Sequence, residues 1–186
     1  RETYSNGLDK SFVSSLQETY GPFILVPEGG YSPTGAKGAS LIMNSIKEMD
    51  ASHICVNVGT ATTLAGLLLE AAPAQKIIAV NVLKNMHDIP ERLYQLTGKN
   101  DFPNLHILDQ YHFGGYAKKT PELLGFMNHF FEQTCIPTDF VYTGKLMYAI
   151  TDQLKKGFFE KDSRIVCLHT GGLQGNRSLK KSKLFY

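Results

Sequence analysis

Small and hydroxyl residues directly follow a continuous apolar run near the middle of the chain, at Gly59-Thr60-Ala61-Thr62-Thr63. The apolar run predicts a buried strand, and the residues after the loop predict a helix. A loop from a strand into a helix leaves backbone N–H groups free at the positive end of the helix dipole, where a phosphate binds well. Gly59 would allow a close approach, and the threonine hydroxyls would add donors. This phosphate loop (residues 59–63) therefore predicts an anion site, although Thr62 or Thr63 capping an ordinary helix would explain it equally well.

The elements that would position this loop alternate between strands and helices. Runs of apolar residues predict strands, and apolar residues at helical spacing predict helices. The predicted strands are 23–26, 53–58, 76–82, 105–108 and 164–168, and the predicted helices are 8–20, 35–49, 62–72, 88–96, 121–134, 146–156 and a closing helix from 173 onward. Small residues at the start of helix 35–49 predict close packing on a sheet.

This alternation predicts the α/β class, a three-layer fold with an open, mostly parallel sheet and helices on both faces. In such sheets ligands bind outside the carboxyl ends of the strands. The polar, glycine-containing loops after Val26, Val58, Leu108 and Leu168 fall at those ends. Their convergence favours the phosphate site over a simple helix cap.

Composition excludes several classes of partner. The 186 residues carry a net charge of +2, which gives no electrostatic case for binding nucleic acid or a membrane. The six histidines and three cysteines show no paired spacing that would suit a metal ion. An odd number of cysteines and the absence of a long apolar span lead us to expect a reducing, cytoplasmic location.

Two nucleotide-binding motifs fail on their spacing. Residues 30–37 resemble a Walker A loop, but the spacing is wrong by one and no Ser or Thr follows Lys37. A Rossmann fingerprint fails because the loop after Gly59 lacks the second glycine. What remains is the phosphate loop, two tyrosines in loops (Tyr116 and Tyr142) and a Thr-Gly-Gly turn at 170–172. That set suits a phosphorylated organic cofactor better than a nucleotide.

Three motifs, taken together and in order, resemble a known family: VGTATTLAGL at 58–67, VYTGKLM at 141–147 and LHTGG at 168–172. They are similar to the pyridoxal-phosphate enzymes of the tryptophan-synthase-β fold type, and within these to the family of 1-aminocyclopropane-1-carboxylate deaminases and D-cysteine desulfhydrases. The Pro-Glu-Gly-Gly turn at 27–30 and Gly115-Tyr116 fit the same pattern. The resemblance spans nearly the whole chain.

The resemblance implies roles for individual residues. The phosphate loop, Gly59 to Thr63, would bind the phosphate of pyridoxal 5'-phosphate, and Thr143 and Thr170 would offer hydroxyls to its pyridine nitrogen. Tyr116 and Tyr142 would be catalytic and face a small amino-acid substrate, which is converted to a 2-oxo acid and ammonia. A phenol with a pKa of about 10 needs help to act as a base, and either tyrosine could instead stack on or cap a loop. The family also leads us to expect a homodimer and no metal.

One departure from the family concerns the substrate. Deaminases of this family carry Glu after the tyrosine that corresponds to Tyr142, whereas this chain has Thr143. A carboxylate would keep the pyridine nitrogen protonated and strengthen the electron sink, and a hydroxyl does so less. The resemblance therefore favours β-elimination of a D-cysteine-like substrate over opening of a cyclopropane ring.

A second departure concerns the lysine that forms the Schiff base with the cofactor. In the family it lies near the start of the chain, upstream of a small domain, and here Lys37 and Lys145 belong to other motifs. We therefore expect residues 1–20 to be the return from a small domain plus a first helix, and residues 21–186 to be an incomplete cofactor-binding large domain that is inactive alone. The alternative is a non-catalytic module that binds a phosphorylated small molecule or a protein partner.

Overall fold

Four parallel strands form the centre of the molecule in the computed structural model, which describes residues 10–180 and 183–186. The sheet has the order β3-β2-β1-β4, and every neighbouring pair is parallel. Its strands are β1 (His53–Val58), β2 (Lys76–Asn81), β3 (Leu105–Leu108) and β4 (Ile165–Cys167). The predicted α/β class with an open parallel sheet is confirmed.

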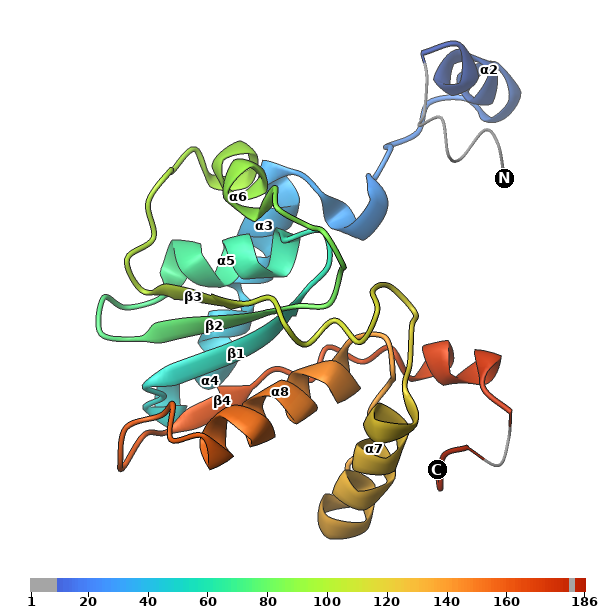
Figure 1. The fold of residues 1–186 in the computed structure, drawn as a ribbon. Coiled ribbons are helices and arrows are strands. Elements are labelled where there is room, and N and C mark those ends of the chain that lie inside the picture. Colours follow the sequence, from blue (N-terminus) through green and yellow to red (C-terminus); the bar gives the residue numbers. More distant parts are fainter. Residues whose placement is uncertain (1–9, 181–182) are drawn as a thin grey trace.

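Helices cover both faces of this sheet (Figure 1). Alternate strand residues point to opposite faces: Ile54 and Val56 pack with α3 to α6, and Cys55 and Ile78 pack with α8. The three predicted layers are therefore present. The helices are α2 (Lys10–Tyr20), α3 (Pro33–Ser40), α4 (Ile42–Ile46), α5 (Thr62–Glu70), α6 (Ile89–Thr97), α7 (Pro121–Thr134) and α8 (Thr143–Lys155), with short 3₁₀ helices η1 (Glu28–Gly30), η2 (Lys47–Met49) and η3 (Leu173–Ser178).

The order of the strands creates a switch point between β1 and β4. From β1 the chain moves outward to β2 and then β3, whereas β4 is added on the other side of β1. Helix α5, which follows β1, packs on one face, and α8, which precedes β4, packs on the other. The connection from β1 to β2 therefore runs over one face of the sheet and the connection into β4 over the other, and in such sheets ligands bind outside the carboxyl ends of the strands at the switch point.

Helix α3 packs mainly on helix α5, and Ala36 and Met43 of the predicted helix 35–49 also share one core cluster with Ile54 and Val56 of the sheet. A Cβ added at Gly66 of α5 would lie 2.6 Å from the carbonyl oxygen of Ala36 and 2.6 Å from the amide nitrogen of Ser40. The small residues of α3 thus allow α3 and α5 to approach backbone to backbone. The predicted helix is also divided at Leu41 into α3 and α4.

The predicted strand at 23–26 is wrong. These residues form neither strand nor helix, and Ile24 and Val26 are 91% and 70% exposed. A strand needs a neighbour to bond with, and none of the described strands pairs with this segment. The closing helix predicted from residue 173 is only the short η3.

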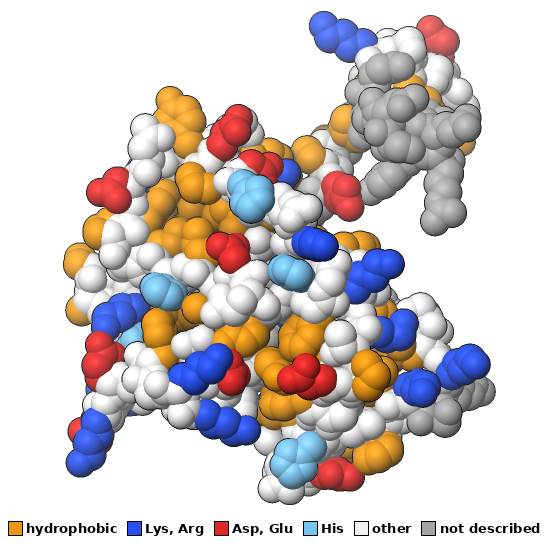
Figure 2. Space-filling view, viewed as in Figure 1, with side chains coloured by type: hydrophobic (Ala, Val, Ile, Leu, Met, Phe, Trp, Pro, Cys, Tyr) orange, Lys and Arg blue, Asp and Glu red, His pale blue; other side chains and the backbone are white. Residues whose placement is uncertain are grey.

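Helix α2 stands away from the rest of the described chain (Figures 1 and 2) and buries none of its residues. The predicted helix 8–20 agrees with it from Lys10 onward, and residues 8 and 9 lie outside the described part. Over the face in Figure 2 acidic and basic side chains are mixed. None of the described helices is long and apolar enough to cross a membrane.

Candidate functional site

A cavity of about 340 Å³ lies at the carboxyl ends of β1 and β4, at the switch point of the sheet. One wall is the phosphate loop with Asn57 and Leu64, and the opposite wall is the turn after β4. Glu28 and Gly29 close a third side, and Tyr142 contributes its ring. The full lining is Glu28, Gly29, Asn57, Gly59, Thr60, Ala61, Thr62, Thr63, Leu64, Tyr142, Thr170, Gly171, Gly172 and Gln174.

The phosphate loop presents uncapped backbone donors to this cavity. Ala61, with φ of 72°, is the residue before α5, and no side chain bonds to the free N–H groups of the first turn. The alternative that Thr62 or Thr63 caps the helix is therefore wrong for this structure. The Thr60 and Thr62 hydroxyls lie 3.0 Å apart, so that one donates a hydrogen bond to the other. Free amides at the positive end of a helix dipole form a site for an anion such as a phosphate.

Two glycines allow close contacts in the wall of this cavity. A Cβ added at Gly59 would lie 3.3 Å from the ring of Tyr142, and one added at Gly29 would lie 2.6 Å from the Thr60 side chain. Both contacts are closer than a side chain tolerates without movement of its neighbour. The two glycines thus allow the Tyr142 ring and the Thr60 side chain to pack directly against backbone in the wall of the cavity.

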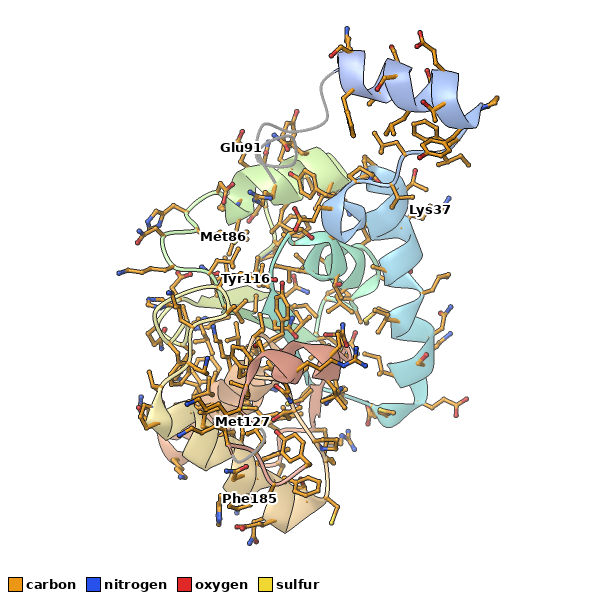
Figure 3. The ribbon with its side chains drawn as sticks, turned by 90° about the vertical axis from the view of Figure 1, so that its right-hand side faces the viewer. Lys37, Met86, Glu91, Tyr116, Met127 and Phe185 are labelled. Carbon is orange, nitrogen blue, oxygen red and sulfur yellow. The ribbon has the colours of Figure 1, made fainter. Side chains whose placement is uncertain are left out.

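The two predicted tyrosines lie against each other at the edge of the cavity. The ring centroids of Tyr116 and Tyr142 are 6.1 Å apart, and the ring planes are inclined by 66° in an edge contact. Tyr142 lines the cavity, whereas Tyr116, which is 60% exposed, lies on the loop between β3 and α7 (Figure 3). Burial raises the pKa of Tyr142 to about 12, and Tyr116, Asp139 and Glu28 add to the shift. Tyr142 is therefore a protonated phenol near neutral pH and offers a hydrogen-bond donor.

The two predicted threonines lie at different depths. Thr170 lines the cavity, and its hydroxyl lies 3.5 Å from Oδ1 of Asn57. Thr143 is fully buried beneath Tyr142 and does not line the cavity. Its hydroxyl donates to Oδ2 of Asp139 at 2.6 Å and accepts from the Asp139 N–H at 2.8 Å. A direct contact between Thr143 and a cofactor thus stays a prediction.

Asp139 holds the segment that carries Tyr142. Its carboxylate is fully buried and accepts from the N–H groups of Val141 and Tyr142 at 2.8 Å each, in addition to the N–H and hydroxyl of Thr143. A Cβ added at Gly172 would lie 3.1 Å from Oδ2 of Asp139, so this carboxylate also adjoins the turn of Thr170. Asp139 therefore connects two walls of the cavity.

Of the residues predicted from the sequence, the phosphate loop, Tyr142 and Thr170 line the cavity, whereas Tyr116 and Thr143 do not. Glu28 and Gly172 lay within motifs that carry the resemblance, although no role followed from them. Asn57 and Gln174 gave no local signal, because only the fold brings them to the cavity, and Asp139 was missed because its bonds to Val141, Tyr142 and Thr143 depend on the turn that it forms.

Neither lysine that the sequence analysis weighed reaches the cavity. Lys37 is on the outer side of α3 and points away from the molecule (Figure 3). Lys145 is fully buried, and its amine is bonded to backbone carbonyl groups outside the cavity. The described residues that line the cavity include neither lysine nor arginine. The described chain also contains no cluster of three or more His, Cys, Asp or Glu that could hold a metal.

The chain is similar over most of its length to two groups of curated proteins. It is 33% identical to a protein assigned as a 1-aminocyclopropane-1-carboxylate deaminase in Pyrococcus furiosus, over 83% of this chain and 51% of that protein. It is 27% identical to a D-cysteine desulfhydrase of Klebsiella pneumoniae, over 89% of this chain and 55% of that protein. The chain thus spans about half the length of these relatives.

A solved structure shows the same arrangement. The crystal structure of a homologue of 1-aminocyclopropane-1-carboxylate deaminase superposes with a TM-score of 0.75 at 26% identity, covering 94% of this chain and 56% of the other. No family model matches the chain.

Proposed function

Because this chain belongs to the family of 1-aminocyclopropane-1-carboxylate deaminases and D-cysteine desulfhydrases, we propose that it is part of a pyridoxal-phosphate enzyme that releases ammonia from a small amino acid. The observation that supports this most is the uncapped start of α5, which opens into the same cavity as Tyr142 and Thr170. The membership also supports a 2-oxo acid as the second product.

The residues present suit pyridoxal 5'-phosphate. The phosphate loop would bind the phosphate, and the rest of the cavity of about 340 Å³, beside Tyr142 and Thr170, would take the ring. Thr170 would meet the pyridine nitrogen from the turn after β4. When bound, the cofactor supplies an electron sink for the bonds at the substrate's α-carbon.

The chain's own groups would bind the substrate and move protons. Tyr142 holds its proton near neutral pH, so it would donate a hydrogen bond or a proton to the substrate. Tyr116 would cover the same side of the cavity. The amine needed to hold the cofactor would come from a lysine outside the described lining, so we propose that this chain alone is inactive. We propose residues 21–186 as the cofactor-binding part of the enzyme.

D-Cysteine is the substrate that we propose first. Thr143 carries no charge, and its hydroxyl is already bonded to Asp139. A site without a carboxylate at this position favours elimination of a good leaving group such as sulfide over ring opening.

The test is to purify the protein that the natural gene encodes and to supply each amino acid separately. D-Cysteine should give pyruvate, sulfide and ammonia, whereas 1-aminocyclopropane-1-carboxylate would give a four-carbon 2-oxo acid and no sulfide. Visible absorbance that borohydride converts to a covalent adduct would support the cofactor assignment. A protein that shows neither adduct nor product would be a non-catalytic binding module, and the proposal would be wrong.

A matched pair of variants tests the phosphate loop. Thr63→Val should weaken binding of the cofactor about tenfold, since one hydroxyl donor to a charged phosphate is lost. Thr151→Val on α8, which does not line the cavity, should leave the affinity unchanged. Equal affinities in the two variants would show that the Thr63 hydroxyl does not contact the phosphate.

A further inference from the structure

Lys145 is a buried cation that the proposed chemistry does not use. It lies in the first turn of α8 with 0% of its surface exposed. Its ammonium group donates to the carbonyl oxygens of Gly115 at 2.7 Å, His112 at 2.9 Å and Val82 at 3.5 Å. An ammonium has three N–H donors, so each of them has one carbonyl partner. Burying a charge is costly unless hydrogen bonds satisfy it. The three carbonyl oxygens therefore form a site that stabilises the Lys145 ammonium group.

Two of the three carbonyl groups belong to the loop that carries Tyr116. This loop, residues 109–120, joins β3 to α7 and has no helix or strand of its own. Within it Phe113, Gly114 and Gly115 have φ of 50°, 95° and 117°. With these positive φ values, residues 113–115 cannot form the regular backbone hydrogen bonds of a helix or a strand. The bonds of Lys145 to His112 and Gly115 therefore tie an irregular loop to α8.

Lys145 is also close in the chain to the other tyrosine. Tyr142 directly precedes α8, and Tyr116 directly follows Gly115, whose carbonyl oxygen accepts from Lys145. Tyr116 is 60% exposed, so few side chains besides that of Tyr142 contact its ring. The backbone of the loop therefore sets how closely the Tyr116 ring can approach the ring of Tyr142, which lies 6.1 Å away.

We propose that Lys145 is a positioning residue that holds Tyr116 against Tyr142 at the edge of the cavity. The proposal rests on the proposed function in one respect, since it takes both tyrosines to face the substrate. The lysine acts through the loop backbone and touches neither substrate nor cofactor. Its burial lowers its pKa to about 8, and the Asp139 carboxylate opposes that shift.

The test uses fluorine NMR of the purified protein labelled with 3-fluorotyrosine, and it needs no catalytic activity. The resonance of Tyr142 is assigned as the one that Tyr142→Phe removes. Tyr116→Phe should move this resonance, because it changes the neighbouring ring. Lys145→Met should move it at least as far, and adding Tyr116→Phe to Lys145→Met should cause little further change.

Two further variants separate positioning from general damage. Lys118→Met removes an exposed lysine from the same loop and should leave the Tyr142 resonance in place. Lys145→Gln keeps two N–H donors and should return the resonance part of the way, and it replaces Lys145→Met if that variant fails to fold. An unmoved Tyr142 resonance in a folded Lys145 variant overturns the proposal. An inactive enzyme with the predicted shifts would contradict the proposed function alone.

Discussion

At the scale of single residues, one carboxylate organises the tyrosine side of the cavity. Asp139 accepts four hydrogen bonds from three consecutive residues, and no water competes for it because it is fully buried. Hydrogen bonds to a charged acceptor are roughly twice as strong as neutral ones. The backbone of Tyr142, with φ of −126° and ψ of −72°, is thus fixed by side-chain bonding before α8 begins.

Asp139→Asn should therefore destabilise the protein. The amide keeps one oxygen but turns an NH₂ group toward N–H donors, which leaves at least one buried donor without a partner. We expect the free energy of unfolding to fall by about 2 kcal/mol, measured by urea denaturation at pH 7.

The matched control is Asp101→Asn, which makes the same change at an exposed position. Its stability should stay within about 0.5 kcal/mol of the natural protein. If the two variants unfold at the same urea concentration, the hydrogen bonds of Asp139 do not hold this segment.

At the scale of elements, the sequence predicts those parts whose signal is local. The strands β1 and β2 are buried on both faces, and the continuous apolar runs that such burial requires identified both. Residues 23–26 form an equally apolar run but no strand. A strand forms only where a neighbouring strand can bond with it, and the apolar run alone does not reveal whether such a neighbour exists. The phosphate loop was found for the same local reason, whereas Asp139 was missed because its partners are defined by the turn that it forms.

The close contact of α3 with α5 gives a prediction at this scale. Gly66→Ala would place a methyl group 2.6 Å from the backbone of α3, so the helices must separate. We expect a loss of about 1–3 kcal/mol in the free energy of unfolding, measured by urea or thermal denaturation.

Gly125 in α7 is the control for this prediction, since a Cβ there would meet no atom within 4 Å. Gly125→Ala should raise stability by about 0.5–1 kcal/mol, because alanine restricts the unfolded chain and favours a helix. The two identical substitutions are thus expected to have opposite signs. A stabilised Gly66→Ala variant would show that α3 and α5 are not in close contact.

At the scale of the whole molecule, the two ends of the sheet have different tasks. The carboxyl ends of β1 and β4 open into the cavity. At the amino end of β1 His53 is 3% exposed, its Nδ1 lies 2.9 Å from the Ser52 hydroxyl and its Nε2 lies 3.5 Å from Glu160. Lys76 of β2 bonds the same glutamate, and the His53 ring packs edge-on against Phe159. At this end of the sheet, titratable side chains contact one another and do not line the cavity.

The separation predicts acid sensitivity that originates far from the cavity. Burial lowers the pKa of His53, Lys76 lowers it further, and Glu160 opposes them. Below the unfolded value of about 6.5, the unfolded chain binds a proton that the folded chain resists. The contribution of His53 to stability is therefore fully present above that pH and is lost as pH falls toward the folded pKa.

His53→Asn, which cannot titrate, should lose less stability than the natural protein between pH 7 and pH 5 in urea denaturation. Its affinity for pyridoxal 5'-phosphate at pH 7 should equal that of the natural protein, since the cavity is at the opposite end of β1. If both proteins lose the same stability between pH 7 and pH 5, a group other than His53 causes the acid sensitivity. If His53→Asn weakens the affinity for pyridoxal 5'-phosphate, the two ends of β1 are coupled through the strand.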